Sequence, residues 1–262
     1  MVALSEDSAL LSRLFQYRFQ SGRGLKGHSF GNLFLMALTQ VLGDFPDAVK
    51  ASSEVLKIAG RIYPSTTANV SLEATLSNGA IIVGETKISR SKHRIQAIRL
   101  RPRKASPLPA ALAAIAEADV VTLGPGSLFT SIVPNLLVHG IAAAIRSSPA
   151  LKCYFVNLMC QPGETDEFRA SDHVRALHRH AGGKFLDYAV VNVRSITSAL
   201  KKRYATQAAL PVENDIDALM KMGLKVLTGN LSSNTDRIRH DPDATADVVM
   251  KLAHEGRRRK NA

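Results

Sequence analysis

The sequence predicts an α/β protein with a Rossmann-like, three-layer architecture and a mainly parallel sheet. From Val120 onward, short apolar runs alternate with segments of helical periodicity, which is the pattern of strands joined by helices. A glycine turn at 124–126 joins the first of these runs to a helix-like segment. The chain has 262 residues, 45% of them apolar, and can bury a large core. We expect one domain over 1–262, with an antiparallel β insert at 61–102 and a basic flexible tail at 255–262.

The first 60 residues are predicted to be helical. An amphipathic helix is expected over 5–19, where five large apolar side chains share one stripe. A glycine-rich loop, 22–32, then leads into an apolar helix that ends near Leu42, and a third helix is expected over 48–58. His28, Ser29 and Asn32 would form a polar, donor-rich helix start. A capped helix with a structural glycine explains these residues as well.

The insert is predicted from a change of periodicity. Alternating apolar residues over 70–76 lead to Asn78-Gly79, and apolar residues resume beyond that dipeptide. Asn-Gly between alternating runs is a strong hairpin signal. The segment 95–100 adds a third strand.

The remainder alternates helix and strand, as in a parallel sheet covered on both faces. Helices are expected over 107–118, 171–180, 195–204, 215–222 and 243–254. Strands are expected over 120–123, 152–158, 187–193 and 225–227.

The stretch from Asp119 to Asn135 reads as strand, tight glycine turn and helix. Gly124 and Gly126 would let the backbone approach a ligand closely, and the first amides of a helix favour an anionic group. Ser127 could cap this helix or donate its hydroxyl to the ligand. The pattern is neither the dinucleotide fingerprint nor a P-loop, so an ordinary strand-to-helix turn is an equal alternative.

Polar residues also follow the next strands of the predicted sheet. Asn157 ends the second strand, Glu164 lies in the loop after it, and Asn192 ends the third. Ligands of open α/β sheets bind outside the carboxyl ends of the strands. We therefore expect a binding site for a sugar or base at this edge, with Glu164 as an acceptor for sugar hydroxyls or a base; a solvent-facing loop acid is the commoner case.

Other titratable residues give weaker indications. Asp172 and His173 open a helix, where a capping role is at least as plausible as a catalytic one. His178 and His180 lack the i, i+4 spacing of a metal pair, so we expect no metal site. Asp241 or Asp243 is expected to cap the last helix.

The net charge of +12 could indicate nucleic acid, but its distribution argues against that partner. Four basic clusters, at 90–94, 99–104, 201–203 and 257–260, lie on separate segments and are expected to be solvated surface and a frayed tail, and aromatic residues make up only 5% of the chain. Cys153 and Cys160 have no metal-type neighbours and are expected to be reduced. We find no apolar run that could span a bilayer and no signal peptide, and expect a cytoplasmic protein.

Five ordered motifs resemble the gluconeogenesis factor family, bacterial relatives of 2-phospho-L-lactate transferase. They are Gly-His-Ser-Phe-Gly-Asn-Leu at 27–33, the segment 123–137, Gln-Pro-Gly-Glu-Thr at 161–165, Ser-Asp-His-Val at 171–174 and Ile-Arg-His-Asp at 238–241. The resemblance implies a Rossmann-like fold that binds a UDP-sugar, with a nicotinamide dinucleotide as another ligand for the same cleft. It also implies a role in cell shape and wall synthesis on gluconeogenic carbon sources, with a second copy or a wall-synthesis protein as partner.

Carried over motif by motif, the resemblance implies eight ligand-facing residues and no catalytic residue. They are His28, Ser29, Asn32, Gly124, Gly126, Ser127, Asn157 and Glu164. Family members begin with a glycine-rich segment and an Asp-Asp-Gly-Gly-Ser loop, which do not occur here. We therefore expect an N-terminally truncated chain without the loop that holds Mg²⁺ in the transferases.

Three classes of function follow from these observations. The first is a regulator that binds a UDP-sugar without turnover. The second is a 2-phospho-L-lactate transferase-type enzyme of coenzyme F420 synthesis. The third is an inactive copy or a module that depends on a partner.

Overall fold

The computed structural model describes residues 9–91, 93–234 and 237–261. The chain forms two compact units, Met1–Thr67 and Ala68–Ala262. Within the described residues, no single helix is long and apolar enough to cross a membrane, although the bent pair Leu128–Leu137 and Ile141–Ser147 meets these criteria jointly.

From residue 9 onward, the N-terminal unit contains the helices α1 (Ala9–Gln16), α2 (Phe30–Leu42) and α3 (Phe45–Val55). The rings of Phe15 and Phe34 pack edge to face with their centroids 4.9 Å apart, which fixes α1 against α2. A methyl group at Gly31 would lie 2.9 Å from the carbonyl oxygen of Phe15, so α2 can approach α1 here only with glycine. The part of the predicted 5–19 helix before Ala9 lies outside the described residues.

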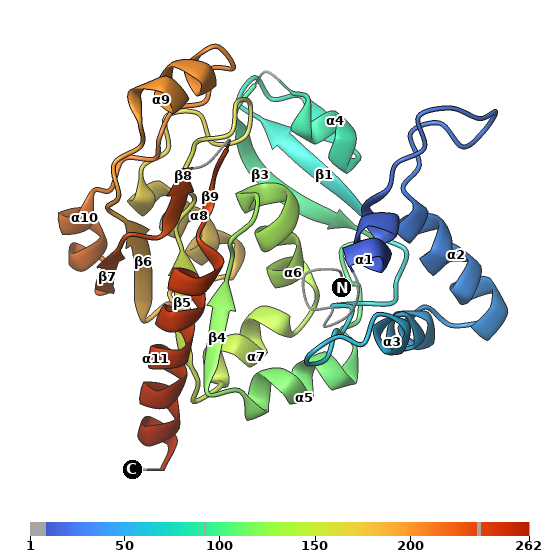
Figure 1. The fold of residues 1–262 in the computed structure, drawn as a ribbon. Helices are drawn as coiled ribbons and strands as arrows, with labels where there is room; N and C mark the ends of the chain where they lie inside the picture. Colours follow the sequence, from blue (N-terminus) through green and yellow to red (C-terminus); the bar gives the residue numbers. More distant parts are fainter. Residues whose placement is uncertain (1–8, 92, 235–236, 262) are drawn as a thin grey trace. The chain divides into compact units, whose positions relative to one another are not determined.

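The second unit is built on a four-stranded parallel sheet of order β4-β5-β6-β7. Its strands are β4 (Val120–Leu123), β5 (Leu151–Phe155), β6 (Tyr188–Asn192) and β7 (Lys225–Gly229). Figure 1 shows their carboxyl ends at one edge of the sheet. The mixed α/β fold and the parallel sheet confirm the predicted fold class.

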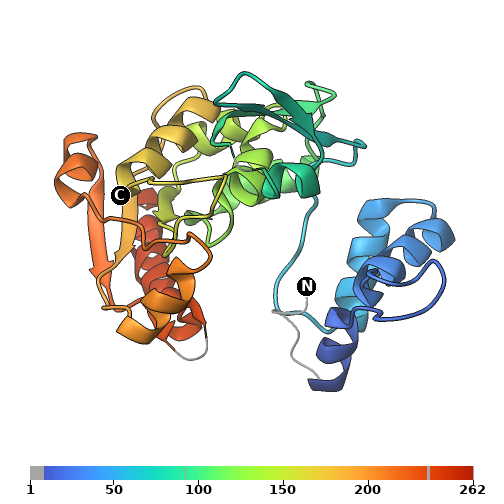
Figure 2. The same ribbon diagram turned by 90° about the horizontal axis from the view of Figure 1, so that it is seen from above.

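Alternate residues of β5 and β6 face two different layers of helices. Cys153, Phe155 and Val190 pack with Leu252 of α11 (Pro242–Lys260), whereas Tyr154 and Ala189 belong to the core on the other face. Figure 2 shows α11 on one side of the sheet and a layer of helices from the same unit on the other side. These helices are α5 (Pro109–Glu117), α6 (Val133–Leu137), α7 (Ile141–Ser147) and α8 (Ala170–His180).

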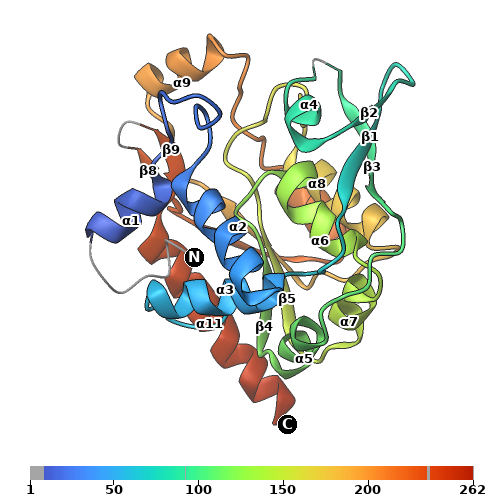
Figure 3. The ribbon, with the colours of Figure 1, turned by 90° about the vertical axis from the view of Figure 1, so that its right-hand side faces the viewer.

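The predicted antiparallel insert is present as a separate sheet of order β2-β1-β3. Its strands are β1 (Ser71–Leu76), β2 (Ile81–Val83) and β3 (Ile95–Arg101), and the short helix α4 (Glu85–Ser89) follows β2. Gly79 has φ +81° and its amide donates to the Leu76 carbonyl at 2.9 Å, as expected for the predicted turn. Figure 3 shows this sheet beside α6 and α8.

The last part of the chain contains α9 (Ser198–Ala205), α10 (Ile216–Lys221) and a two-stranded hairpin that the sequence did not predict. The hairpin strands are β8 (Ser232–Asn234) and β9 (Ile238–His240). Asp241 caps α11, its carboxylate accepting from the Ala244 amide at 3.0 Å. The segment expected as a flexible tail is helical as far as Lys260, and two of its cations pair with carboxylates at the start of β4 and β6.

Candidate functional site

The glycine turn after β4 is held close to the next strand. Gly124 has φ +82°, and a methyl group there would lie 3.2 Å from the carbonyl oxygen of Phe155. The positive φ favours glycine, and the close contact adds to the cost of any side chain here. Beyond the turn, Leu128–Ile132 is π-helical before α6 begins, because the Ile132 amide reaches back to the Ser127 carbonyl at 3.0 Å. The regular helix expected directly after Ser127 therefore does not form.

Glu164 occupies the amides that the turn was expected to offer to a ligand. Its side chain is 4% exposed, and Oε1 accepts from the Phe129 amide at 2.8 Å. Burial raises the pKa of Glu164, while the amides of Phe129 and Thr130 oppose that shift. The geometry therefore favours a role for Glu164 in holding the turn from inside the protein, not the ligand-facing role that the sequence suggested.

Ser127 and Asn157 connect the turn to the loop after β5. The Gln161 Nε2 donates to the Ser127 hydroxyl oxygen at 2.9 Å, and the Asn157 Nδ2 donates to the Gly126 carbonyl at 2.9 Å. The Ser127 side chain makes no helix-capping hydrogen bond, so the capping role predicted for it is wrong. Gly124, Gly126, Ser127, Asn157 and Glu164 thus form one cluster at the carboxyl edge of the sheet.

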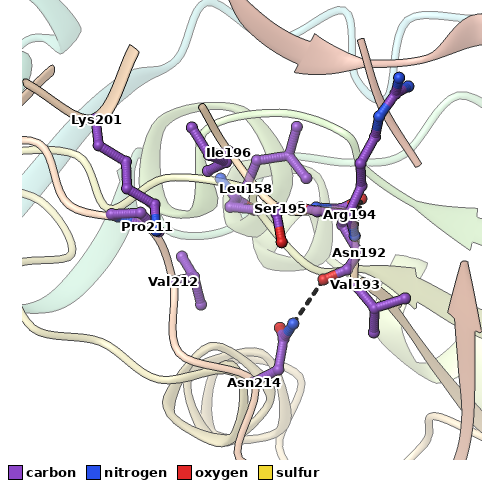
Figure 4. Close-up of a pocket in the computed structure, with 11 residues that line it drawn as sticks. Leu158, Asn192, Val193, Arg194, Ser195, Ile196, Lys201, Pro211, Val212 and Asn214 are labelled. Atoms are coloured by element: carbon purple, nitrogen blue, oxygen red, sulfur yellow. Dashed lines mark hydrogen bonds between the residues drawn. The ribbon is translucent and has the colours of Figure 1, made fainter. Parts of the chain in front are cut away.

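A pocket of about 330 Å³ opens beside this cluster, at the ends of β5 and β6 (Figure 4). Asn157 and Asn192 line it from the strand ends, and Arg194 and Lys201 supply two positive charges. The Arg194 Nη1 donates to the Ser232 carbonyl at 2.9 Å, which holds its side chain against the β8–β9 hairpin. Across the described residues, the Lys201 ammonium has no hydrogen bond or ion pair.

The walls of the pocket are fixed by hydrogen bonds around Asn192. Its Oδ1 accepts from the Leu231 amide at 2.9 Å, and its carbonyl accepts from the Asn214 Nδ2 at 2.6 Å. Figure 4 shows the Asn214 contact and places Lys201 and Arg194 at opposite ends of the pocket. A polar pocket with two cations and amide donors suits an anionic ligand that carries hydroxyl or carbonyl groups.

Sequence reasoning missed most of this pocket. It named Asn157 and Asn192, but it assigned Lys201 to a solvated basic cluster and gave Arg194 no role. Arg194 belongs to the site because of a contact with Ser232, 38 residues further along the chain. The position of Arg194 directly after the strand predicted over 187–193 was the one available signal.

The other three predicted ligand residues lie in the N-terminal unit. Ser29 caps α2, and its hydroxyl accepts from the Asn32 amide at 3.3 Å. His28 and Asn32 are exposed beside it. The structure thus shows the capped helix start that the sequence allowed, and a ligand contact for these residues stays a prediction.

Two residues at the start of α8 have different roles. The Asp172 carboxylate accepts from the Arg169 amide at 3.0 Å, which confirms the predicted capping role. His173 is fully buried, and this burial lowers its pKa to about 4. No group of three or more histidines, cysteines or acidic residues that could hold a metal occurs in the described part of the chain.

Comparisons with known proteins agree with the motifs. The family model described as 2-phospho-L-lactate transferase CofD matches residues 1–232. The Bacillus subtilis protein named gluconeogenesis factor is 42% identical over 256 residues, covering 97% of this chain and 81% of that protein. A relative from Aquifex aeolicus is 43% identical over 256 residues, covering 96% of this chain and 78% of the relative. A crystal structure of a UPF0052 family member from Bacillus halodurans has a TM-score of 0.91 at 39% identity, covering 95% of this chain and 80% of that one.

Proposed function

Because this chain belongs to the 2-phospho-L-lactate transferase CofD family, alongside proteins named gluconeogenesis factor, we propose that it is a regulatory protein that binds a UDP-sugar. The proposal places this protein in the cytoplasm, where ligand binding adjusts cell shape and wall synthesis on gluconeogenic carbon sources. The observation that carries the proposal is the polar pocket at the carboxyl ends of β5 and β6. Ligands of open α/β sheets bind at this edge.

The chemistry of the pocket supports a nucleotide sugar. Arg194 and Lys201 suit the two negative charges of a diphosphate. Asn157 and Asn214 supply amide groups that can pair with a uracil edge or with sugar hydroxyls. Gly126 is hydrogen-bonded to Asn157, so the proposal keeps Gly124, Gly126 and Ser127 as ligand contacts beside the pocket.

Calorimetric titration with UDP-glucose tests the proposal. We expect saturable binding without turnover, and a weakening of about tenfold for Lys201→Ala, because a charge-assisted hydrogen bond to a partly exposed group contributes roughly 1 to 2 kcal/mol. Lys202→Ala is the matched control, since it removes the same charge from the next position of α9 outside the pocket lining. Absence of UDP-glucose binding to the unaltered protein would refute the proposal.

The description of the family model favours one alternative, a transferase of the 2-phospho-L-lactate type. This alternative predicts product formation from a deazaflavin acceptor, whereas the regulator predicts ligand binding alone. NAD is the second ligand to titrate, because a dinucleotide carries the same diphosphate. A preference for NAD over UDP-glucose would support the proposed binding site but identify its ligand as a dinucleotide.

A further inference from the structure

Behind the pocket, a chain of hydrogen bonds runs from the glycine turn to the buried imidazole of α8. The Gly126 carbonyl accepts from the Asn157 Nδ2 at 2.9 Å. The Tyr154 hydroxyl lies 2.8 Å from the Asn157 Oδ1 and 3.0 Å from the His173 Nδ1. Tyr154 and His173 are both fully buried, so no bulk water competes for these groups.

The Gly126 carbonyl fixes which atom donates in every hydrogen bond of this series. A backbone carbonyl can only accept, so the amide nitrogen of Asn157 must face Gly126 and its oxygen must face Tyr154. Tyr154 has a single hydroxyl proton, which is then donated to Asn157. The remaining contact requires the His173 Nδ1 to carry a hydrogen and donate to the Tyr154 oxygen.

This assignment leaves the His173 Nε2 without a hydrogen in the neutral ring. That atom is buried and has no hydrogen-bond partner in the described part of the structure. An unpaired acceptor is tolerated in protein interiors more readily than an unpaired N–H. The opposite tautomer would bury an unpaired donor and would also leave the Tyr154 contact without a proton.

The imidazole ring is also held in place by packing. It stacks on the Tyr154 ring with the centroids 6.3 Å apart, and the Phe168 ring meets it edge-on at 5.5 Å. Neither His173 nor Tyr154 lines the pocket, but Asn157 does. One amide hydrogen of Asn157 is used by Gly126, and the second has no acceptor among the described residues.

We infer that Tyr154 and His173 are positioning residues that lock the Asn157 amide so that its second N–H is presented to the ligand as a donor. This inference rests on the proposed function, because it assigns a role within the same site. Without the lock, the amide could rotate and present its oxygen, which would repel the anionic or carbonyl oxygen of a nucleotide.

Two variants separate positioning from general stability. Tyr154→Phe removes the donor to Asn157, and we expect the affinity for UDP-glucose to fall about tenfold. Tyr188→Phe is the matched control, because the Tyr188 hydroxyl donates to Glu255 at 2.6 Å near the amino end of the neighbouring strand. Each variant removes the hydroxyl of a sheet tyrosine that makes two polar contacts, Tyr154 with Asn157 and His173 and Tyr188 with Glu255 and Lys225, but only Tyr154→Phe is expected to weaken binding. Equal affinities for the two variants would overturn the inference.

A second measurement needs neither a variant nor a ligand. Nitrogen-15 NMR of the histidine side chains in the unaltered protein reports which ring nitrogen of His173 carries the hydrogen. We expect the Nδ1–H form at pH 7, and an Nε2–H form would overturn the inference. If the unaltered protein fails to bind UDP-glucose, the proposed function fails. The tautomer of His173 still shows whether the hydrogen bonds from His173 through Tyr154 to Asn157 run in the inferred direction.

Discussion

The two edges of the parallel sheet use charged residues differently. At the amino edge, the Asp119 carboxylate accepts two hydrogen bonds from the Arg257 guanidinium, at 2.9 and 3.0 Å. The Asp187 carboxylate lies 3.7 Å from the Arg259 guanidinium. At the carboxyl edge, the Lys201 ammonium has no partner in the described part of the chain. Paired charges hold the last helix on the sheet, whereas an unpaired cation is available to a ligand. The comparison predicts that changes at the amino edge alter stability alone, and that changes at the carboxyl edge also alter binding.

The largest effect on stability is expected at the amino edge, from Gly256→Ala. A methyl group at this position of α11 would lie 2.0 Å from the carbonyl oxygen of Asp119, which accepts a hydrogen bond from the Leu151 amide and cannot easily move. We expect a loss of about 3 kcal/mol or more in the free energy of unfolding, as for severe overpacking. Urea unfolding measures this loss.

An exposed position two residues earlier supplies the control for this experiment. His254→Ala, on the same helix, should change the urea midpoint little. If Gly256→Ala proves as stable as the unaltered protein, the close contact between α11 and the Asp119 carbonyl does not require glycine, which would contradict the prediction.

Acid should destabilise the two edges in different pH ranges. Burial lowers the pKa of His173 from 6.5 to about 4, so the unfolded chain binds more protons as the pH falls below 6.5. The resulting loss of stability grows until the pH reaches about 4, and at pH 5 it amounts to about 2 kcal/mol. Arg257 holds the pKa of Asp119 below its usual 3.8, so that contribution is present above pH 3.8 and is lost only below it.

Urea unfolding at pH 7.5, 6 and 5 tests the range assigned to His173, in which the Asp119 contribution is constant. His173→Phe removes the titrating group and should flatten the slope between pH 6.5 and 5. If stability depends on pH just as steeply in that variant, the acid sensitivity belongs to other groups. His178, His180 and His240 are the candidates, because burial lowers their pKa values too.

A change at the glycine turn is expected to affect both stability and binding. Gly124→Ala places a side chain at φ +82° and 3.2 Å from the Phe155 carbonyl oxygen. We expect a loss of about 1 to 2 kcal/mol in stability from the strained backbone and the close contact. Displacement of the turn should also weaken UDP-glucose binding, which calorimetry measures. Gly256→Ala, examined under conditions where it is folded, should bind normally, and weakened binding there would break the comparison between the edges.

Sequence reasoning predicted the sheet well because its signals are local. The apolar runs ending at Leu123 and Asn192 and the glycines at 124 and 126 specify strands and a turn through neighbouring residues alone. The β8–β9 hairpin was missed because its strands have three residues each, too few for a periodic pattern. The contact of Glu164 with the Phe129 amide was not predicted because Phe129 lies 35 residues earlier in the chain. The cations after Gly256 resembled a free tail because their partners are still more remote in the sequence; Asp119 lies 138 residues before Arg257.

The smallest effect is expected from Arg257→Ala, which tests whether the paired charges of the amino edge matter at all. Arg257 is largely exposed, and ion pairs between exposed groups are weakened by solvent and salt. We expect a fall in the urea midpoint smaller than that of Gly124→Ala, and the fall should shrink in 1 M salt. Arg258→Ala removes the neighbouring cation, for which the described residues provide no ion-pair partner, and should leave the midpoint unchanged. Equal effects of the two variants would mean that net charge, and not the contact with Asp119, holds the end of α11 on the sheet.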